Sequence, residues 1–193
     1  MAVSTVVADR IDAQLETEQT DCYRVILFNG AGAEILLQRH SEAYALPKVR
    51  VPKFTRPAEQ VTSFLRNNWG VATVLLLSEC VVSGQETVCY ATLEMIEERQ
   101  RTLLGMDWFP INEAAAHLLD GGDGSALKSS HERVFHQCSA GSAPFSRLGW
   151  IRRLQEWTQT VLGSHGAEIR DFQQLNGGGS FSLVRFETTQ KPV

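Results

Sequence analysis

The chain has 193 residues, of which 43% are hydrophobic and 21% are charged, and its formal net charge is −4. This composition is typical of a globular protein and excludes a disordered, collagen-like or fibrous chain. The slightly acidic balance gives no indication of binding to nucleic acid or to anionic membranes. The length suffices for one domain with a sizeable core, or for one domain with a small appendage.

The cysteines and the N-terminus indicate the cellular compartment. The four cysteines form no C-x-x-C pair and no spacing of the zinc type; they are Cys22, Cys80, Cys89 and Cys138. We therefore expect reduced, buried thiols. The N-terminus lacks the basic start and apolar run of a secretory signal, and no run reaches the roughly 18 apolar residues of a membrane span. The sequence predicts a cytoplasmic protein without a membrane partner.

The first predicted elements are strands. Residues 1–20 are polar and mixed and define no element. Residues 22–28 are apolar and β-branched and end in a glycine-containing turn, so they predict a strand whose partner returns over residues 34–39. Three prolines near residues 41–56 predict an ordered loop with short extended pieces.

A helix follows this loop. Pro57 suits the first turn of a helix, where its missing N–H costs nothing. Apolar residues then recur at helical spacing, and Gly70 stands where a left-handed C-cap is expected. The pattern predicts an amphipathic helix over residues 57–69 that buries Val61 and Leu65.

The central part of the chain predicts a second hairpin and two helices. Residues 71–82 and 87–96 are apolar and rich in β-formers, and a polar turn separates them. Residues 107–111 predict a short strand. Asn112 is expected to cap a helix over residues 114–119, which the glycines of residues 120–124 stop, and a further helix is expected over residues 125–137.

The composition changes after residue 138. Residues 139–144 predict a linker, and Ser146 is expected to cap a helix that ends at Gly163. Its apolar residues form one stripe at helical spacing, which predicts a packing face; they are Trp150, Leu154, Trp157 and Val161. Residues 172–175 and 180–188 predict two strands around a glycine-rich turn. The whole mixture predicts an α+β fold or an α/β sandwich with a mixed sheet.

Several short motifs carry a family resemblance. They occur in chain order before the loop, at its entry, at the end of the predicted helix and further downstream. The first two are Leu36-Leu37-Gln38-Arg39 and Leu46-Pro47, the helix end carries Leu65 and Trp69-Gly70-Val71, and the downstream motif is Trp108–Glu113. Over roughly residues 20–120 the sequence resembles the Nudix hydrolase superfamily. The resemblance implies an α/β/α sandwich with a mixed sheet, here as a domain of residues 1–138, followed by a linker helix and hairpin over residues 139–193.

The family's signature, G-x5-E-x7-R-E-U-x-E-E-x-G-U with U aliphatic, is degenerate here. We align the last glycine of the signature on Gly70. In this register three residues keep the pattern: Leu65, Gly70 and Val71. The remaining positions are occupied by other residue types: Val49, Thr55, Ser63, Phe64, Asn67 and Asn68. In the family, the carboxylates of this box hold Mg²⁺ or Mn²⁺ against a diphosphate. Because hard divalent cations require anionic oxygens, we expect no metal site at this helix.

The same segment is basic instead of acidic. Residues 47–66 contain Lys48, Arg50, Lys53, Arg56 and Arg66 against a single glutamate. This local excess disfavours a cation and favours an anion. We therefore take Lys48, Arg50 and Lys53, together with Arg39, as candidate ligand-binding residues for a phosphate-bearing small molecule. The alternative is a solvated basic loop without a ligand.

Carboxylates outside the box are the candidate catalytic residues. Some enzymes of the family take a base from elsewhere in the chain. Glu94 and Glu98 can share one side of a strand, whereas Glu97 cannot, because side chains alternate along a strand. The alternative is a polar strand end without a catalytic role.

The C-terminal segment resembles a second family. From Pro144 to Thr188 the sequence is similar to the lead-in of aminoglycoside-phosphotransferase-type kinases, in which a Trp-bearing helix precedes a glycine-containing hairpin. That resemblance implies a following phosphotransferase-like domain and a chain that is the N-terminal part of a longer protein. In kinase-like folds such a loop covers nucleotide phosphates. No catalytic residue of the kinase family is carried over to this segment.

These observations predict a Nudix-fold module that has lost its metal-binding carboxylates and acts in recognition, regulation or assembly within a larger phosphotransferase-like protein. No cofactor and no enzymatic activity are expected. The first alternative is a divergent hydrolase of nucleoside diphosphate-linked compounds, a pyrophosphohydrolase that uses Mg²⁺ or Mn²⁺. The second is a structural module that forms a homodimer through its tryptophan stripe.

Overall fold

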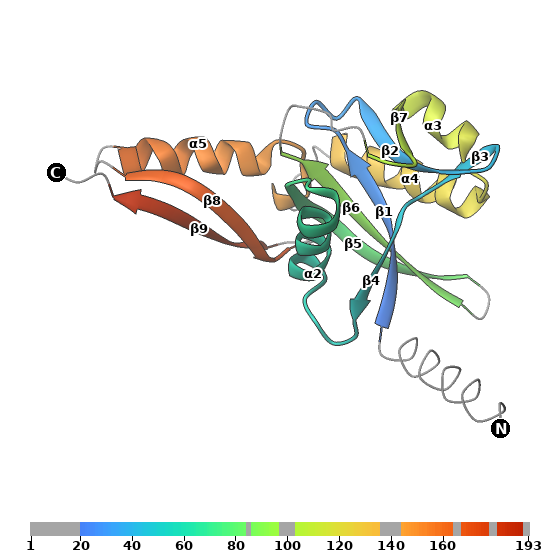
Figure 1. The fold of residues 1–193 in the computed structure, drawn as a ribbon, viewed down its shortest axis with the longest axis horizontal. Coiled ribbons are helices and arrows are strands. Elements are labelled where there is room, and N and C mark those ends of the chain that lie inside the picture. The colour runs from blue at the N-terminus through green and yellow to red at the C-terminus, as the bar shows by residue number, and fades with distance from the viewer. Residues whose placement is uncertain are drawn as a thin grey trace, which may run out of the picture.

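The structure is a computed structural model that describes residues 20–83, 86–96, 103–135, 144–163, 167–177 and 181–190 (Figure 1). Residues 1–19, which predicted no element, lie outside this part of the chain, and so does the boundary expected at residue 138. Two bodies are visible in Figure 1: a sheet covered by helices, and an arm of one helix and one hairpin that projects from it.

The main sheet has seven strands in the described residues and is mixed. Its central order is β3-β2-β1-β6-β5, while β4 pairs with β1 and β7 pairs with β2. Only the β1–β6 pair is parallel among these ladders. The strands are β1 (Thr20–Phe28), β2 (Glu34–His40), β3 (Ala43–Ala45), β4 (Lys48–Pro52), β5 (Thr73–Ser83), β6 (Glu86–Met95) and β7 (Met106–Pro110).

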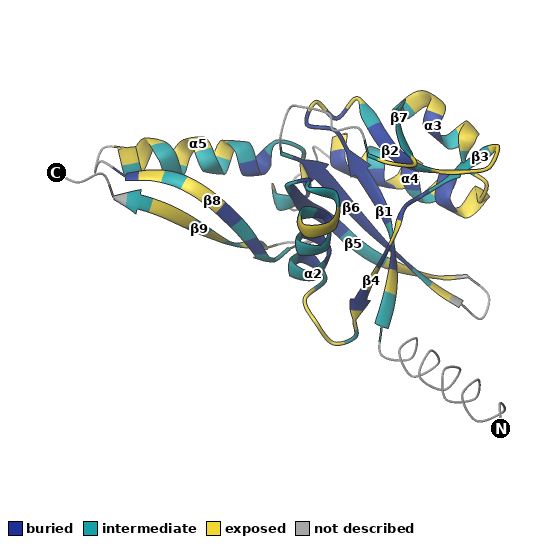
Figure 2. Cartoon of the chain, in the orientation of Figure 1, coloured by how far each residue is buried: buried dark blue, intermediate teal, exposed yellow. Residues whose placement is uncertain are grey.

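Helices cover both faces of this sheet. The helical segments are α2 (Pro57–Phe64), η1 (Leu65–Trp69), α3 (Ile111–His117), α4 (Gly121–Phe135), η2 (Pro144–Ser146) and α5 (Trp150–Gly163). One buried cluster joins α2 and η1 to one sheet face through Ala58, Val61 and Leu65. A second cluster joins α3, α4 and the start of α5 to the other face. The predicted α/β/α sandwich with a mixed sheet is confirmed, and Figure 2 shows its buried central strands.

The helix predicted over residues 57–69 is confirmed, with a change of winding inside it. It is α-helical to Phe64 and π-helical from Leu65 to Trp69. Gly70 follows in the left-handed conformation with φ of 65°, as its expected capping role requires. Val61 and Leu65 are fully buried, as predicted.

Two predicted helix starts are wrong. Helix α3 begins at Ile111 after Pro110, so Asn112 is inside it rather than at its cap. The glycines after Asp120 do not stop a helix but begin α4, because Asp120 Oδ1 accepts the Gly122 N–H at 2.8 Å in the manner of an N-cap. Asp123 in the first turn pairs with Arg24 of β1, which anchors this start to the sheet.

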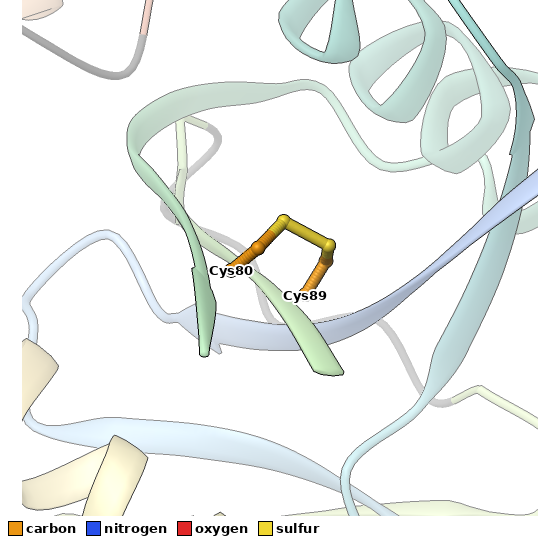
Figure 3. Close-up of a disulfide and its surroundings, with 2 residues drawn as sticks. All are labelled: Cys80 and Cys89. Carbon is orange, nitrogen blue, oxygen red and sulfur yellow. A yellow bond between two sulfur atoms is a disulfide. The ribbon is translucent and has the colours of Figure 1, made fainter. Parts of the chain in front are cut away.

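The prediction of reduced, buried thiols is also wrong. Cys80 and Cys89 stand opposite each other on the antiparallel strands β5 and β6 and form a disulfide (Figure 3). Cys22 is an exposed free thiol. Cys138 lies outside the described residues. The spacing of Cys80 and Cys89 carries no disulfide signal by itself, because only the register of the hairpin brings their side chains together.

The arm contains α5 and a separate two-stranded antiparallel sheet, β8 (Ala167–Asn176) and β9 (Leu183–Gln190). The predicted hairpin is therefore confirmed, with a longer first strand. Helix α5 ends at Gly163 as predicted but begins at Trp150, not after Ser146. The predicted packing face holds only at its start, since Trp150 is 5% exposed whereas Trp157 is 65% exposed.

Within the described residues, no helix combines the length and the apolar character that a membrane span requires.

Candidate functional site at the box helix

The helix to which the resemblance assigns the box presents no set of metal ligands among its described residues. Phe64, at a glutamate position of the family pattern, packs its ring edge-on against Trp69 with centroids 6.1 Å apart. The Asn68 Nδ2 donates to the Phe64 carbonyl at 2.9 Å, so this amide serves the helix itself. Across the described part of the chain, no group of three or more His, Cys, Asp or Glu residues could hold a metal ion.

An arginine of this helix instead holds the C-terminal hairpin. Arg66 Nη1 lies 2.6 Å from the Asp171 carboxylate, and Arg66 Nη2 donates to the Phe172 carbonyl at 3.0 Å. The guanidinium carbon also lies 5.8 Å from the centre of the Phe172 ring. One side chain of the helix thus makes three kinds of contact with β8, and the hairpin occupies the flank of the box helix.

A buried glutamine fastens the same strand to the sheet edge. Gln174 is 1% exposed, and its amide pairs with one residue of the edge strand β5. Its Oε1 accepts the Leu75 N–H at 2.7 Å, and its Nε2 donates to the Leu75 carbonyl at 3.0 Å. These bonds lie where the β5–β6 register shifts between Leu75 and Leu77. The Gln174 amide therefore pairs with the backbone N–H and C=O of Leu75 in the way that a neighbouring strand would.

The first glycine of the predicted phosphate-covering loop has a packing role. A Cβ atom at Gly177 would lie 2.1 Å from Gln174 Nε2, which no real contact allows. Gly177 therefore leaves room for the amide that pairs with Leu75. Gly178 and Gly179 lie outside the described residues.

The predicted anion-binding residues are distributed over three places. Along β4, Lys48 and Arg50 are exposed and alternate with buried residues that face α2, so their side chains lie on the opposite face of the sheet. Lys53 lies in the turn before α2. The structure thus brings Lys48 and Arg50 onto one face and leaves Lys53 in a neighbouring loop.

Arg39 is engaged in an ion pair on β2. Its Nε and Nη2 lie 3.0 and 2.6 Å from Asp107 Oδ2, and the Tyr44 hydroxyl donates to the same oxygen at 3.0 Å. The Arg39 guanidinium lowers the pKa of the Asp107 carboxyl from its usual value. Arg39 therefore already has an anionic partner, which distinguishes it from Lys48 and Arg50.

The candidate base Glu94 lies on the sheet face away from the box helix. Its neighbours Leu93 and Met95 face α2, while the Glu94 carboxylate is fully buried beneath the start of α5. It accepts the Gly149 N–H at 2.7 Å and lies 2.9 Å from Arg152 Nη2. Burial raises its pKa, against the opposing effect of these two donors. Glu98 lies outside the described residues.

The residues that make this site, Arg66, Asp171 and Gln174, were not singled out by the sequence. Arg66 was one of five basic residues in its segment, and its acidic partner lies far away in the chain. One signal could have drawn attention to Arg66. It lies within the box, directly before Asn67 and Asn68, at a position where the family pattern specifies no residue type.

No protein-family model matches the chain, and no curated protein matches it. Solved structures with a similar fold include the Escherichia coli ORF135 protein, with a TM-score of 0.44, 15% identity, and coverage of 61% of this chain and 94% of that one. The Caenorhabditis elegans Ap4A hydrolase has a TM-score of 0.44 and 13% identity over 55% of this chain and 92% of that chain. The Nudix hydrolase RenU of Mycobacterium smegmatis has a TM-score of 0.40 and 17% identity over 57% of this chain and 83% of that chain.

Proposed function

We propose that the chain is a Nudix-type module whose box helix has exchanged metal binding for docking of the C-terminal hairpin. Its role is recognition or assembly, not hydrolysis, within a larger phosphotransferase-like protein. The observation that carries the proposal is the set of contacts from Arg66 to Asp171 and Phe172, made by the helix that holds metal in the family.

The box residues do not fit Mg²⁺ or Mn²⁺. A hard divalent cation takes several anionic or carbonyl oxygens, with carboxylates as its principal protein ligands. At the glutamate positions the helix offers a phenyl ring packed on Trp69 and two amides, of which Asn68 already bonds the backbone. No step of a hydrolytic mechanism is therefore assigned to this helix.

The decisive experiment combines a metal titration with a turnover assay. The chain is incubated with Mg²⁺ or Mn²⁺ and a panel of nucleotides, nucleotide sugars and dinucleotides, and cleavage of the diphosphate bond is measured. We expect no metal-dependent turnover. Turnover at about 1 s⁻¹ or faster that Glu94→Gln abolishes would establish the divergent hydrolase instead.

A gain-of-binding variant supplies the matched control. Asn67→Glu combined with Asn68→Glu restores two carboxylates at exposed positions of η1. We expect the double variant to bind Mn²⁺ more tightly than the parent chain in an equilibrium titration. Equal affinity of both proteins for Mn²⁺ would show that the box residues do not limit metal binding.

The ligand of the recognition module is proposed to be a phosphate-bearing small molecule held without metal by Lys48, Arg50 and Lys53. The support is the exposure of Lys48 and Arg50 on one sheet face. Calorimetry with pyrophosphate in the presence of a chelator should show binding that weakens with salt. If replacing all three residues by alanine leaves the affinity unchanged, the basic loop is only a solvated surface.

A dimerisation module is the second candidate function. The observation that favours it is the exposed outer half of α5, where Trp157 and Val161 are 65% and 43% exposed. Sedimentation equilibrium of the chain and of its Trp157→Ser variant tests it, since a dimer held by this stripe should dissociate more readily in the variant.

A further inference from the structure

A polar cleft of about 220 Å³ lies between the box helix and the hairpin. From the sandwich it is lined by Thr62, Ser63, Arg66, Asn67 and Thr73, and from the hairpin by Asp171, Phe172, Gln173, Gln174 and Glu187. Only Phe172 among these is apolar. The volume corresponds to roughly seven water molecules, so the cleft suits a small ligand rather than a nucleotide.

Several polar groups of the lining have unused hydrogen-bonding capacity. Thr73 is 3% exposed, and its buried Oγ1 has no hydrogen-bond partner in the described structure. A buried hydroxyl without a partner costs free energy that a suitable ligand removes. The side chains of Ser63 and Asn67 likewise make no hydrogen bond among the described residues, and they lie on consecutive turns of the helix.

The charges of the lining favour a single positive charge on the ligand. Arg66 is the one cationic lining residue in the described cleft, and Asp171 neutralises it. Glu187 stands directly across the hairpin from Asp171, and Arg185 Nη2 lies 3.8 Å from its Oε1. Two carboxylates placed opposite each other on neighbouring strands repel, so an additional cation beside Glu187 is favoured.

The same lining disfavours the other ligand classes. An anion would meet an excess of one carboxylate and an arginine that is already paired. Beyond the Arg66–Asp171 pair, a divalent metal ion would find only the carboxylate of Glu187, fewer than such an ion requires. An ammonium group, in contrast, donates three hydrogen bonds and matches the carboxylate, amide and hydroxyl oxygens that remain.

We propose that this cleft between the box helix and the β8–β9 hairpin binds a small hydroxylated primary amine, whose ammonium group pairs with Glu187 and whose hydroxyl group bonds the Thr73, Ser63 and Asn67 side chains. The site goes beyond the proposed anion site, because Lys48, Arg50 and Lys53 do not line the cleft. Both sides of the cleft are needed, so the ligand also strengthens the attachment of the hairpin to the helix.

Three probes of equal length and different charge test the proposal on the full chain. They are 4-amino-1-butanol, 1,4-butanediol and 4-hydroxybutanoate, each titrated at pH 7 while the amide signals are followed by NMR. We expect the amine to saturate with a dissociation constant of about 1 mM or tighter, the diol to bind at least about tenfold more weakly, and the acid not to saturate. Equal affinities within about twofold, or no saturation by the amine, overturn the proposal.

Variants separate the cleft from any other amine site. Glu187→Gln should weaken binding of the amine by about tenfold and leave the diol unaffected. Glu132→Gln, on the exposed side of α4, makes the same charge change elsewhere and should alter neither. Asn67→Leu keeps the size of the side chain but removes its hydrogen-bonding groups from the cleft, and it should weaken binding of the amine while the unfolding midpoint stays close to that of the parent chain. Unchanged amine affinity in both Glu187→Gln and Asn67→Leu would place the amine elsewhere and refute the site.

Discussion

The C-terminal arm is attached to the sandwich by two arginine–carboxylate pairs. The arm supplies the arginine in one pair and the carboxylate in the other. At the first, Arg152 of α5 reaches the buried carboxylate of Glu94 in the sheet. At the second, Arg66 of the sandwich reaches the Asp171 carboxylate of the arm, and both side chains stay partly exposed. Removing the partner of a buried charge costs much unfolding free energy, whereas an exposed ion pair contributes little to stability. The first contact fixes the arm, and the second orients it.

Removing the arginine of the buried pair should have the largest effect. Arg152→Ala leaves the Glu94 carboxylate buried without its cation, and the variant should lose about 3 kcal/mol of unfolding free energy, near the lower end of the usual range because the Arg152 guanidinium is itself partly exposed. Urea denaturation at pH 7 measures it. Arg153→Ala, at the exposed neighbouring position, is the control. Equal losses in the two variants would remove the distinction between the attachments.

The buried amide at the second attachment should rank next. Gln174→Leu makes the side chain apolar at a similar size and leaves the N–H and C=O of Leu75 unpaired. We expect a loss of about 1–3 kcal/mol in the same assay. Gln173→Leu changes the neighbouring, less buried glutamine and should cost much less. If both substitutions have the same small effect, the glutamine does not hold the hairpin.

The buried carboxylate also predicts a dependence on pH. Because burial raises the pKa of Glu94 in the folded chain, its contribution to stability is fully present below the unfolded-state pKa and is lost as the pH rises through the folded-state pKa. The stability of Glu94→Gln relative to the parent should therefore improve as the pH rises above the unfolded-state pKa of a glutamate. Glu132→Gln should show no such trend, and a flat difference for Glu94→Gln would contradict the direction of the shift.

The exposed pair should give the smallest change. Arg66→Ala removes the contacts with Asp171 and Phe172, and we expect a loss of about 0.5–1 kcal/mol, less in high salt. Its effect on hydrogen exchange should nevertheless be local, with faster exchange in β8 and unchanged exchange in β1. A loss as large as that of Arg152→Ala would mean that the two attachments are equivalent.

Local patterns were sufficient to predict most helices and strands, and the family resemblance supplied the α/β/α sandwich. Pro57 and Gly70 bound a helix by their own backbone preferences, and the apolar run of residues 22–28, its glycine-containing turn and the returning segment 34–39 predict two strands without reference to distant residues. These features depend on neighbours in the chain, and the structure confirms the helix and strands that they predict.

The contacts that define the site could not be predicted because each joins distant parts of the chain. Gln174 shows no sign in the sequence that its amide will replace a strand for Leu75, and Arg66 shows no sign that its partner is Asp171. The disulfide of Cys80 and Cys89 depends on the hairpin register, which the sequence leaves open by a residue or more. In the sequence the glycines after Asp120 predict a helix end, although they begin α4. Glycine occurs at both ends of helices, so its presence alone does not tell which end it marks.

The parallel pairing of β1 with β6 has a consequence for the order in which the chain folds. β1 meets β2 through a short turn, but its long ladder runs from Tyr23 beside Cys89 to Phe28 beside Glu94, and the helix α2 and strand β5 are synthesised in between. Non-local pairs of this kind form slowly because a long loop must close first. On the ribosome, β1 can pair with β2 and β4 early, but its ladder with β6 cannot form until β6 has emerged, so that edge of β1 stays unpaired while the chain between them is synthesised.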